Sequence, residues 1–346
     1  MKVGTITFHW VNNYGAVLQA YALQQYLLSK GFDTQIIDYR PRLVILRQYF
    51  LALKSREFPF FKQEKQLKNF RKKYLNLTKK SYPTNNSLKK EHFLFNAIIA
   101  GSDQIWNESF TLRAEGKPTL SYFLNFASSS VKRISYAVSF GFHKPIERYI
   151  EVVKDEIKKF CAISVREDDG KDIVEAFSLS SEIVCDPTAL LKKEDYEKIA
   201  NKDLLKPMKV FAYILRKNQT DAWKTAQYVG NIYGEKISEN KFCDSMENWL
   251  ASILNSEIVV TNSFHGLMLS IIMNKPFIAL TIKDSGMNSR ISTLLSNVGL
   301  TSRCIDEFSE DKIQSILSEK IDWNSVNGKI NQLRSTGVDF LNRVLD

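Results

Sequence analysis

Apolar stretches alternate with helical patterns from the first residues of the chain onward. Residues 3–8 alternate and then stay apolar, which predicts a strand, and residues 16–27 repeat apolar side chains at helical spacing. Gly31 follows at the position of a C-cap glycine, and residues 34–39 predict a second strand. Strand, loop, helix and strand in this order form the opening unit of a parallel α/β sheet.

The alternation continues to the C-terminus and is interrupted once. Lys-rich polar residues at 201–207 precede a new apolar strand at 210–215, so we place a domain boundary at residue 204. The fold class that we expect is α/β, with two Rossmann-like domains facing a cleft. The expected parts are an N-terminal α/β domain over 1–204 with a basic helical insertion at about 40–90, a C-terminal α/β domain over 205–325, and a final helix over 326–346 that packs back on the first domain. Further strands are predicted at 97–100, 133–138, 162–165 and 182–185 and near Ile258 and Phe277, and further helices at 145–160 and 171–177.

The composition is that of a folded protein without disulfides. The 346 residues are 44% apolar and 12% aromatic, enough for about two domains with cores of their own. The four cysteines lie far apart and show neither metal-ligand spacing nor the rhythm of a secreted disulfide framework. No apolar run reaches the ~20 residues that cross a bilayer, and the first residues lack a signal-peptide pattern. We therefore expect a cytoplasmic protein.

One segment makes the chain basic. The net charge is +10, and residues 40–90 hold fifteen Lys or Arg against two acids, whereas the remainder of the chain sums to −3. Aromatic residues interleave with these cations, a mixture suited to peripheral contact with an anionic membrane, here the inner membrane face. The alternative is a solvated helical face whose aromatic side chains pack inward. No nucleic-acid-binding motif accompanies the charge, so nucleic acid is not an expected partner.

A histidine lies where an apolar strand gives way to a helical pattern in the second half of the chain. The sequence there is Thr261-Asn262-Ser263-Phe264-His265-Gly266. Ligands of α/β enzymes bind in the crevice outside the carboxyl ends of parallel strands, and histidine exchanges a proton near neutral pH. His265 is therefore a candidate acid or base. The alternative is a hydrogen-bonded histidine that finishes a strand.

Two polar loops follow predicted strands of the first domain. Asn13-Tyr14-Gly15 opens a helix, where backbone amides and a glycine suit an anion, although no G-x-G-x-x-G fingerprint is present. In the second loop Ser102 and Asp103 can bind hydroxyl groups, and Trp106 offers a flat face of the kind on which sugars stack. The alternative for this loop is a capped helix start with a core tryptophan.

Two arginines are candidate anion ligands. Arg166 follows a predicted strand, and its planar fork of donors matches a carboxylate or phosphate, with Glu167 placed to orient it. A surface ion pair is the alternative for Arg166, and Arg290 is a second candidate in the other domain.

Asp186 precedes a proline that stops a strand and is interpreted as structural. P-loop, His-x-x-x-His, Cys-x-x-Cys and G-x-S-x-G patterns are absent, so neither a metal nor a covalent serine mechanism is indicated.

Taken together, these loops resemble the polysaccharide pyruvyl transferase family across most of the chain. The motifs that carry the resemblance are Asn13-Tyr14-Gly15-Ala16, Gly101-Ser102-Asp103-Gln104-Ile105-Trp106-Asn107, Ser164-Val165-Arg166-Glu167, Asp186-Pro187-Thr188 and Ser263-Phe264-His265-Gly266. The resemblance implies a GT-B-like fold, phosphoenolpyruvate as donor without a cofactor, and transfer of pyruvate as a cyclic ketal onto two hydroxyls of a sugar. It implies an acceptor that is a glycan or a lipid-linked precursor of bacterial surface polymers such as capsule or exopolysaccharide.

The resemblance also implies roles for single residues. Arg166 matches the arginine that holds the anionic groups of the donor, and His265 matches the histidine thought to act as acid. Several members carry a second arginine two positions before that histidine, where this chain has Ser263. We expect Arg290 to supply the missing charge and Asp103 to orient or deprotonate the acceptor hydroxyl.

Two other functions stay open on the sequence alone. A nucleotide-sugar glycosyltransferase would use the same architecture, because a fold does not determine a function. It would form its product from a sugar nucleotide without phosphoenolpyruvate. A non-catalytic subunit that docks on a glycan or a membrane would tolerate the loss of Arg166 and His265. It would not tolerate neutralisation of four lysines of the basic segment, Lys72, Lys73, Lys79 and Lys80.

Overall fold

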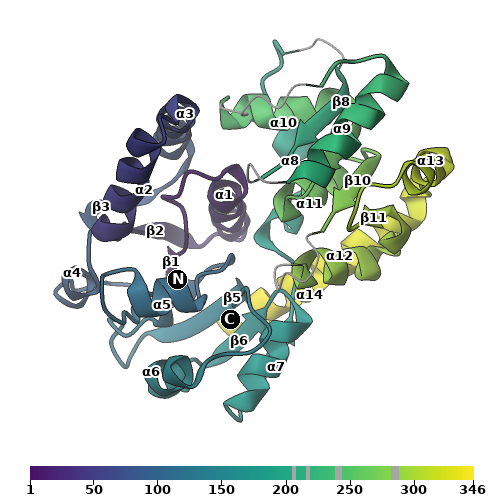
Figure 1. Ribbon diagram of the computed structural model, residues 1–346. Coiled ribbons are helices and arrows are strands. Elements are labelled where there is room, and N and C mark those ends of the chain that lie inside the picture. The colour runs from purple at the N-terminus through teal and green to yellow at the C-terminus, as the bar shows by residue number, and fades with distance from the viewer. Residues whose placement is uncertain (205–207, 216–218, 238–243, 282–287) are drawn as a thin grey trace. The chain divides into compact units, whose positions relative to one another are not determined.

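The protein consists of two compact α/β units (Figure 1). Unit 1 comprises Met1–Leu190 and Arg334–Asp346, and unit 2 comprises Leu191–Leu333. Each unit is built on its own parallel sheet, which confirms the predicted α/β class. The computed structural model describes residues 1–204, 208–215, 219–237, 244–281 and 288–346.

Unit 1 has a seven-stranded sheet in the order β3-β2-β1-β4-β5-β6-β7, and every neighbouring pair is parallel. The strands are β1 (Lys2–Ile6), β2 (Asp33–Tyr39), β3 (Leu77–Tyr82), β4 (Ala97–Ala100), β5 (Lys132–Val138), β6 (Ala162–Val165) and β7 (Glu182–Ile183). The central strand β4 is apolar and buried at every position, as expected where helices cover both faces of a parallel sheet. The strand order reverses between β1 and β4, and ligands of such sheets bind at this switch point.

The helices of unit 1 follow from local signals. In α1 the side chain of Asn13 accepts a hydrogen bond from the backbone N–H of Ala16 and starts the helix. Gly31, just past the C-terminal end, has φ = +81°, a conformation that glycine adopts without strain. The helices are α1 (Tyr14–Ser29), α2 (Arg42–Lys54), α3 (Phe58–Tyr74), α4 (Asn85–Lys89), α5 (Glu108–Arg113), α6 (Glu147–Ile157) and α7 (Asp168–Ala176), with 3-10 turns η1 (Ser121–Phe123) and η2 (Pro187–Ala189).

The basic segment is helical only in part. The segment, predicted as a helical insertion, forms the helices α2, α3 and α4, but it also contributes β3, the edge strand of the sheet, which was not predicted. Thr78, Lys79 and Lys80 in this strand are partly or fully exposed, because an edge strand has a neighbour on one side only. The strand therefore shows no apolar run from which it could be predicted.

Unit 2 has a four-stranded parallel sheet in the order β11-β10-β9-β8. The unit begins at Leu191, ahead of the boundary suggested at residue 204, and α8 within it packs against α10. Asn201 joins the same contact, since its backbone N–H donates to the carbonyl of Glu247 at 3.0 Å. The elements are α8 (Lys193–Glu197), β8 (Met208–Tyr213), α9 (Thr220–Tyr233), α10 (Met246–Asn255), β9 (Ser256–Thr261), α11 (Phe264–Ile272), β10 (Phe277–Leu280), α12 (Ser289–Val298), η3 (Thr301–Arg303), β11 (Cys304–Ile305), α13 (Glu310–Ser318) and α14 (Trp323–Leu345).

Helix α14 is divided between the units at Arg334. In its second half the Arg334 guanidinium donates to the carbonyl of Ala189 at 2.6 Å, and the ring of Phe340 packs against Tyr136. Across the described part of the chain, no helix combines the length and apolar character that crossing a bilayer requires.

Candidate functional site

Three of the predicted motifs meet at one edge of the sheet of unit 1. Ser102, Arg166 and Asp186 follow β4, β6 and β7. Asp186 Oδ2 accepts hydrogen bonds from Ser102 Oγ at 2.9 Å and from Arg166 Nη1 at 2.8 Å. Asp186 Oδ1 accepts from the backbone N–H and the hydroxyl of Thr188 at 3.0 and 2.6 Å. All four side chains are buried. Through these hydrogen bonds the Asp186 carboxylate joins its own loop to the loops of Ser102 and Arg166, which lie far apart in sequence.

Arg166 lies among three carboxylates. Besides Asp186, Asp103 Oδ1 lies 3.8 Å from Nη2 and Glu167 Oε2 lies 3.7 Å from Nε. Burial opposes the charge of the guanidinium, but the carboxylates of Asp186, Glu167 and Asp103 outweigh it and raise the pKa of Arg166. The alternative of a surface ion pair is wrong, because the residue is 4% exposed. The acids hold a permanently charged guanidinium in one orientation.

Asp103 adopts an unusual backbone conformation beside this cluster. Its φ is +76°, in the left-handed region that is costly for most residues and that Asp tolerates better than most. Its Oδ1 accepts from the backbone N–H of Gln104 at 2.9 Å, and its carbonyl accepts from Ser139 N at 2.9 Å. The half-buried carboxylate is thereby directed toward Arg166.

Two side chains expected to bind the acceptor are enclosed instead. Trp106 has no exposed surface, and its indole stacks on Phe123 at 4.8 Å and meets Phe140 and Phe160 edge to face. An indole packed in this way offers no face to a sugar, so the prediction of a stacking tryptophan is corrected to the core tryptophan that was the alternative. Ser102 is also fully buried, and its hydroxyl hydrogen is donated to Asp186. Ser102 therefore supports the carboxylate rather than a ligand.

The loop after β1 borders a hollow of about 360 Å³ within unit 1. Asn12 and Asn13 line it together with residues of the C-terminal half of α2. Asn12 Nδ2 donates to the carbonyl of Phe60 at 3.0 Å, which ties the loop to α3. Tyr14 and Gly15, the other predicted donor ligands in this loop, are buried in the first turn of α1.

A buried histidine at the same sheet edge escaped the sequence reasoning. His9 has no exposed surface, and its Nε2 lies 2.7 Å from Asp38 Oδ1, while Asp38 also pairs with Arg40. Burial lowers the pKa of His9 against the opposing effect of Asp38. Burial acts to raise the pKa of Asp38, but His9 and Arg40 outweigh it and lower that pKa. The available signal was the position of both residues near the ends of two adjacent parallel strands.

In unit 2 the turn after β9 is fixed by neutral groups. Thr261 Oγ1 donates to the carbonyl of Tyr213 at 2.6 Å and accepts from Ser263 N at 3.0 Å. The side chain of Asn262 makes two hydrogen bonds with the backbone of Leu215, at 2.7 and 2.9 Å. A Cβ on Gly266 would lie 2.8 Å from Thr261 Oγ1, so the tight turn requires glycine there. The turn is held rigidly at the carboxyl edge of the sheet.

His265 is the second residue of α11, the helix that this turn begins. The residue is 6% exposed, and its ring meets Phe264 edge to face at 5.2 Å. Ser263 caps the helix by accepting from Gly266 N at 3.2 Å, a role that an arginine at this position would not fill. Arg290, the other predicted cation of unit 2, is the second residue of α12 and is partly exposed.

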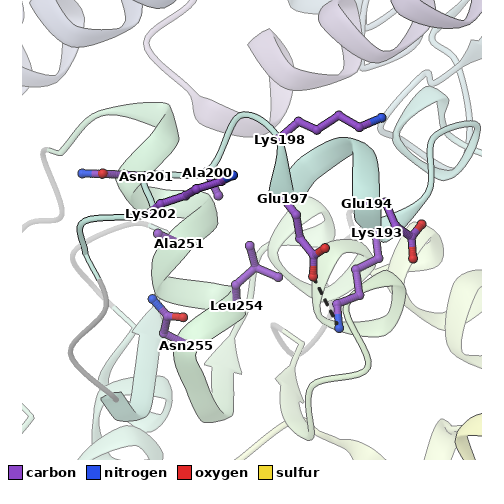
Figure 2. A pocket seen from close by; sticks show the side chains of 10 residues that line it. All are labelled: Lys193, Glu194, Glu197, Lys198, Ala200, Asn201, Lys202, Ala251, Leu254 and Asn255. Atoms are coloured by element: carbon purple, nitrogen blue, oxygen red, sulfur yellow. Dashed lines mark ion pairs between the residues drawn. The ribbon is translucent and has the colours of Figure 1, made fainter.

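A second hollow lies in unit 2, between α8 and α10. Figure 2 shows the side chains that line it, among them the ion pair of Lys193 and Glu197. The two charged atoms of this pair are 3.6 Å apart. None of the predicted site residues lines this hollow.

The cysteines and acids show no sign of other chemistry in the described part of the chain. No group of three His, Cys, Asp or Glu side chains there is placed to hold a metal ion. Burial raises the pKa of the Cys185 thiol to about 12, which keeps it protonated and unreactive. Cys161 and Cys304 are free thiols, and Cys243 lies outside the described residues.

The family is decided by a sequence comparison. The sequence model of the family "Polysaccharide pyruvyl transferase" matches residues 13–284, which includes Asn13 at the start of α1, the Arg166 cluster and the turn before α11. The chain belongs to the polysaccharide pyruvyl transferase family. The resemblance inferred from the motifs is thereby confirmed, and the chain is a transferase of this family. A search of curated proteins found no significant match.

The solved structures that are similar to the chain share its fold at low sequence identity. UDP-GlcNAc 2-epimerase from Neisseria meningitidis, solved with UDP-GlcNAc, superposes with a TM-score of 0.55 at 10% identity, over 99% of this chain and 100% of its own. The epimerase from Methanocaldococcus jannaschii has a TM-score of 0.53 at 13% identity, over 99% and 100%. UGT89C1 from Arabidopsis thaliana has a TM-score of 0.50 at 12% identity, over 97% and 94%. These likenesses confirm the GT-B-like fold.

Proposed function

We propose that this transferase moves the pyruvyl group of phosphoenolpyruvate onto two hydroxyls of a sugar, in the biosynthesis of a bacterial surface polysaccharide. The observation that carries the proposal is the family match over residues 13–284. It is supported by the position of the family motifs, which follow β4, β6, β7 and β9 at the carboxyl ends of parallel strands.

The chemistry needs one proton donor and one proton acceptor. A proton added to the methylene carbon of phosphoenolpyruvate leaves an oxocarbenium-like centre at the neighbouring carbon. The first sugar hydroxyl attacks that carbon and loses its proton, the bond to phosphate breaks, and the second hydroxyl closes the ring. One hydroxyl proton restores the acid and the other leaves with inorganic phosphate, so the products are a cyclic ketal and phosphate.

His265 is our proposed proton donor. Two observations support this assignment. His265 lies just after a rigid strand-to-helix turn, and an imidazole exchanges protons near neutral pH. Because it is 6% exposed, its ring is largely shielded from bulk water. The backbone N–H groups of the first turn of α11 favour a negatively charged ligand nearby.

The anionic groups of the donor are assigned to arginines. Arg166 is charged and is oriented by the neighbouring carboxylates. Arg290 supplies the positive charge that several family members carry at the position of Ser263. The Ser263 oxygen caps α11, and its hydroxyl hydrogen can still be donated to a phosphate oxygen. Asn13-Tyr14-Gly15 completes the proposed donor set at the start of α1.

Asp103 is the proposed acceptor-side residue, and its place beside Arg166 makes its role testable. If Arg166 binds the donor, the Asp103 carboxylate 3.8 Å from the guanidinium repels that donor. We expect Asp103→Asn to lower KM for phosphoenolpyruvate and to lower kcat at the same time, by about 10²-fold or more if the carboxylate takes the hydroxyl proton. A variant with kcat unchanged would remove Asp103 from the mechanism.

The reaction itself is tested with the purified protein, phosphoenolpyruvate and a panel of lipid-linked and nucleotide-linked sugars. We expect phosphate release that depends on the acceptor and matches the pyruvyl ketal formed, one for one. Sugar nucleotides offered without phosphoenolpyruvate form the control. Two results together would overturn the proposal: no acceptor causes phosphate release from phosphoenolpyruvate, and the control forms a glycosidic product. The protein would then be a nucleotide-sugar glycosyltransferase.

A further inference from the structure

Helix α2 is apolar on two opposite faces. Val44, Ile45 and Ala52 pack against unit 1 on one side. On the other side Leu43, Leu46, Phe50 and Leu53 follow one another at spacings of three and four residues and are 54, 53, 65 and 64% exposed. A surface helix of a globular protein normally presents polar residues outward, so this stripe of large apolar side chains indicates a binding surface.

Cations flank the apolar stripe on α2 and are also exposed on the neighbouring helix α3. On α2 the exposed Arg42, Arg47 and Lys54 flank it at helical spacing. On α3, which lies beside α2 in Figure 1, Phe58 is 73% exposed. The cations exposed on α3 are Lys62, Lys65, Lys68, Lys72 and Lys73. Apolar side chains and a positive surface thus occur on the same pair of helices.

The two helices are fixed to the unit, so the surface exists before any partner arrives. Tyr49 of α2 packs edge to face on Phe60 and Phe61 of α3, at 5.6 and 5.8 Å. Buried Arg71 of α3 pairs with Glu64 and donates to the carbonyl of Val11 at 3.4 Å. A preformed surface loses little conformational entropy on binding.

We propose that α2 and α3 dock unit 1 on the surface of an anionic lipid bilayer. Leu46, Phe50 and Leu53 enter the boundary between headgroups and acyl chains, and the flanking cations contact the headgroups. The cations and the apolar stripe of this segment favour a bilayer over two other occupants, a second copy of this chain and nucleic acid. A second copy of this chain would bring together two segments that each carry a balance of +13, and nucleic acid would leave the leucine and phenylalanine stripe without a partner.

The test is co-sedimentation of the full chain with vesicles. Vesicles of phosphatidylcholine alone are compared with vesicles of phosphatidylcholine and phosphatidylglycerol in equal parts, at low and at high salt. We expect binding to the anionic vesicles that weakens with salt, because surface charges are screened. The assay contains neither phosphoenolpyruvate nor a sugar, so its result is independent of the proposed function.

Two double variants separate the apolar and the electrostatic contributions. We expect L46S/F50S to bind the anionic vesicles at least about tenfold more weakly, since two large apolar side chains no longer leave water. We expect R47Q/K54Q to weaken binding at low salt by roughly fivefold per cation and to have little effect at high salt.

Matched variants guard against general effects of substitution. L94S/I232S removes two side chains that are 71 and 50% exposed outside this surface, and K154Q/K158Q removes two exposed cations at the C-terminal end of α6, Lys158 being its C-cap residue. We expect both to bind vesicles as the unchanged protein does. Equal binding to neutral and anionic vesicles, no binding to either, or a dimer in solution that L46S/F50S dissociates would each overturn the proposal.

Discussion

The carboxyl edges of the two sheets hold their polar side chains in different ways. In unit 1 the edge is ionic, with buried Arg166 among carboxylates and buried His9 against Asp38. In unit 2 the turn after β9 is held by the neutral groups of Thr261 and Asn262. Buried charges are costly to leave unpaired, whereas neutral hydrogen bonds contribute about 1 kcal/mol each. Substitutions that leave a buried charge unpaired at the first edge should therefore act on folding, and those at His265 on turnover.

The largest expected effect is that of His265→Asn on turnover. The amide keeps much of the shape of the imidazole but cannot supply the proton, so kcat for phosphate release from phosphoenolpyruvate should fall by about 10²- to 10⁴-fold. Urea unfolding should change little, which would set this residue apart from the ionic edge of unit 1. His143→Asn, at an exposed histidine, is the matched control. Near-normal turnover of His265→Asn would falsify the assignment.

Next in size is the effect of Asp186→Ala on stability. The substitution leaves the buried guanidinium of Arg166 without its 2.8 Å partner, and breaking one side of a buried ion pair costs about 3–5 kcal/mol. The free energy of unfolding in urea is the measurement. The double variant D186A/R166M removes both charges and should recover part of the loss. If the single substitution cost under about 1 kcal/mol, the ion pair of Asp186 and Arg166 would not stabilise the fold as a buried pair does.

A smaller effect is expected from two glycines of α14, Gly337 and Gly328. A Cβ on Gly337 would overlap Tyr136 Oη and would lie 2.8 Å from Sγ of Cys185, which directly precedes Asp186. Gly337→Ala should therefore cost about 1–3 kcal/mol by overpacking. Gly328, in the same helix, has no atom within 4 Å of that position, and Gly328→Ala should gain up to about 1 kcal/mol from helix propensity. Equal unfolding free energies for the two variants would contradict this packing.

The smallest effect is a pH dependence from His9. Burial lowers the pKa of His9 in the folded protein below 6.5, so the unfolded chain takes up this proton first as the pH falls. The free energy of unfolding should therefore decline below about pH 6.5 and level off below the folded pKa. Asp38, whose pKa is lowered from 3.8, adds a loss in the same direction at more acidic pH.

The measurement is urea unfolding from about pH 8 to about pH 5 in the unchanged protein and in His9→Asn. The variant should lack the first decline. A decline of equal size in both proteins would assign it to another group.

Local patterns predicted much of the fold. Strands β4 and β6 begin and end at the residues predicted from their apolar runs, and α1 contains the whole of the predicted helix. Strand β3 was not predicted, because an edge strand rich in lysine has no apolar run. The exposed stripe of α2 also resembles a core face in sequence, since periodicity does not tell which apolar face is covered.

The sequence by itself determined the alternation of apolar strands and helices, the basic segment and the motifs that follow each apolar strand, because these depend on neighbouring residues and on helix and strand periods. Only the tertiary structure decided which motifs meet. Asp186 joins Ser102 and Arg166 because the strand order places β4, β6 and β7 on the same side of the switch point, and that order arises from packing between distant segments. The same packing enclosed Trp106 among aromatic rings, which its position after a strand did not reveal.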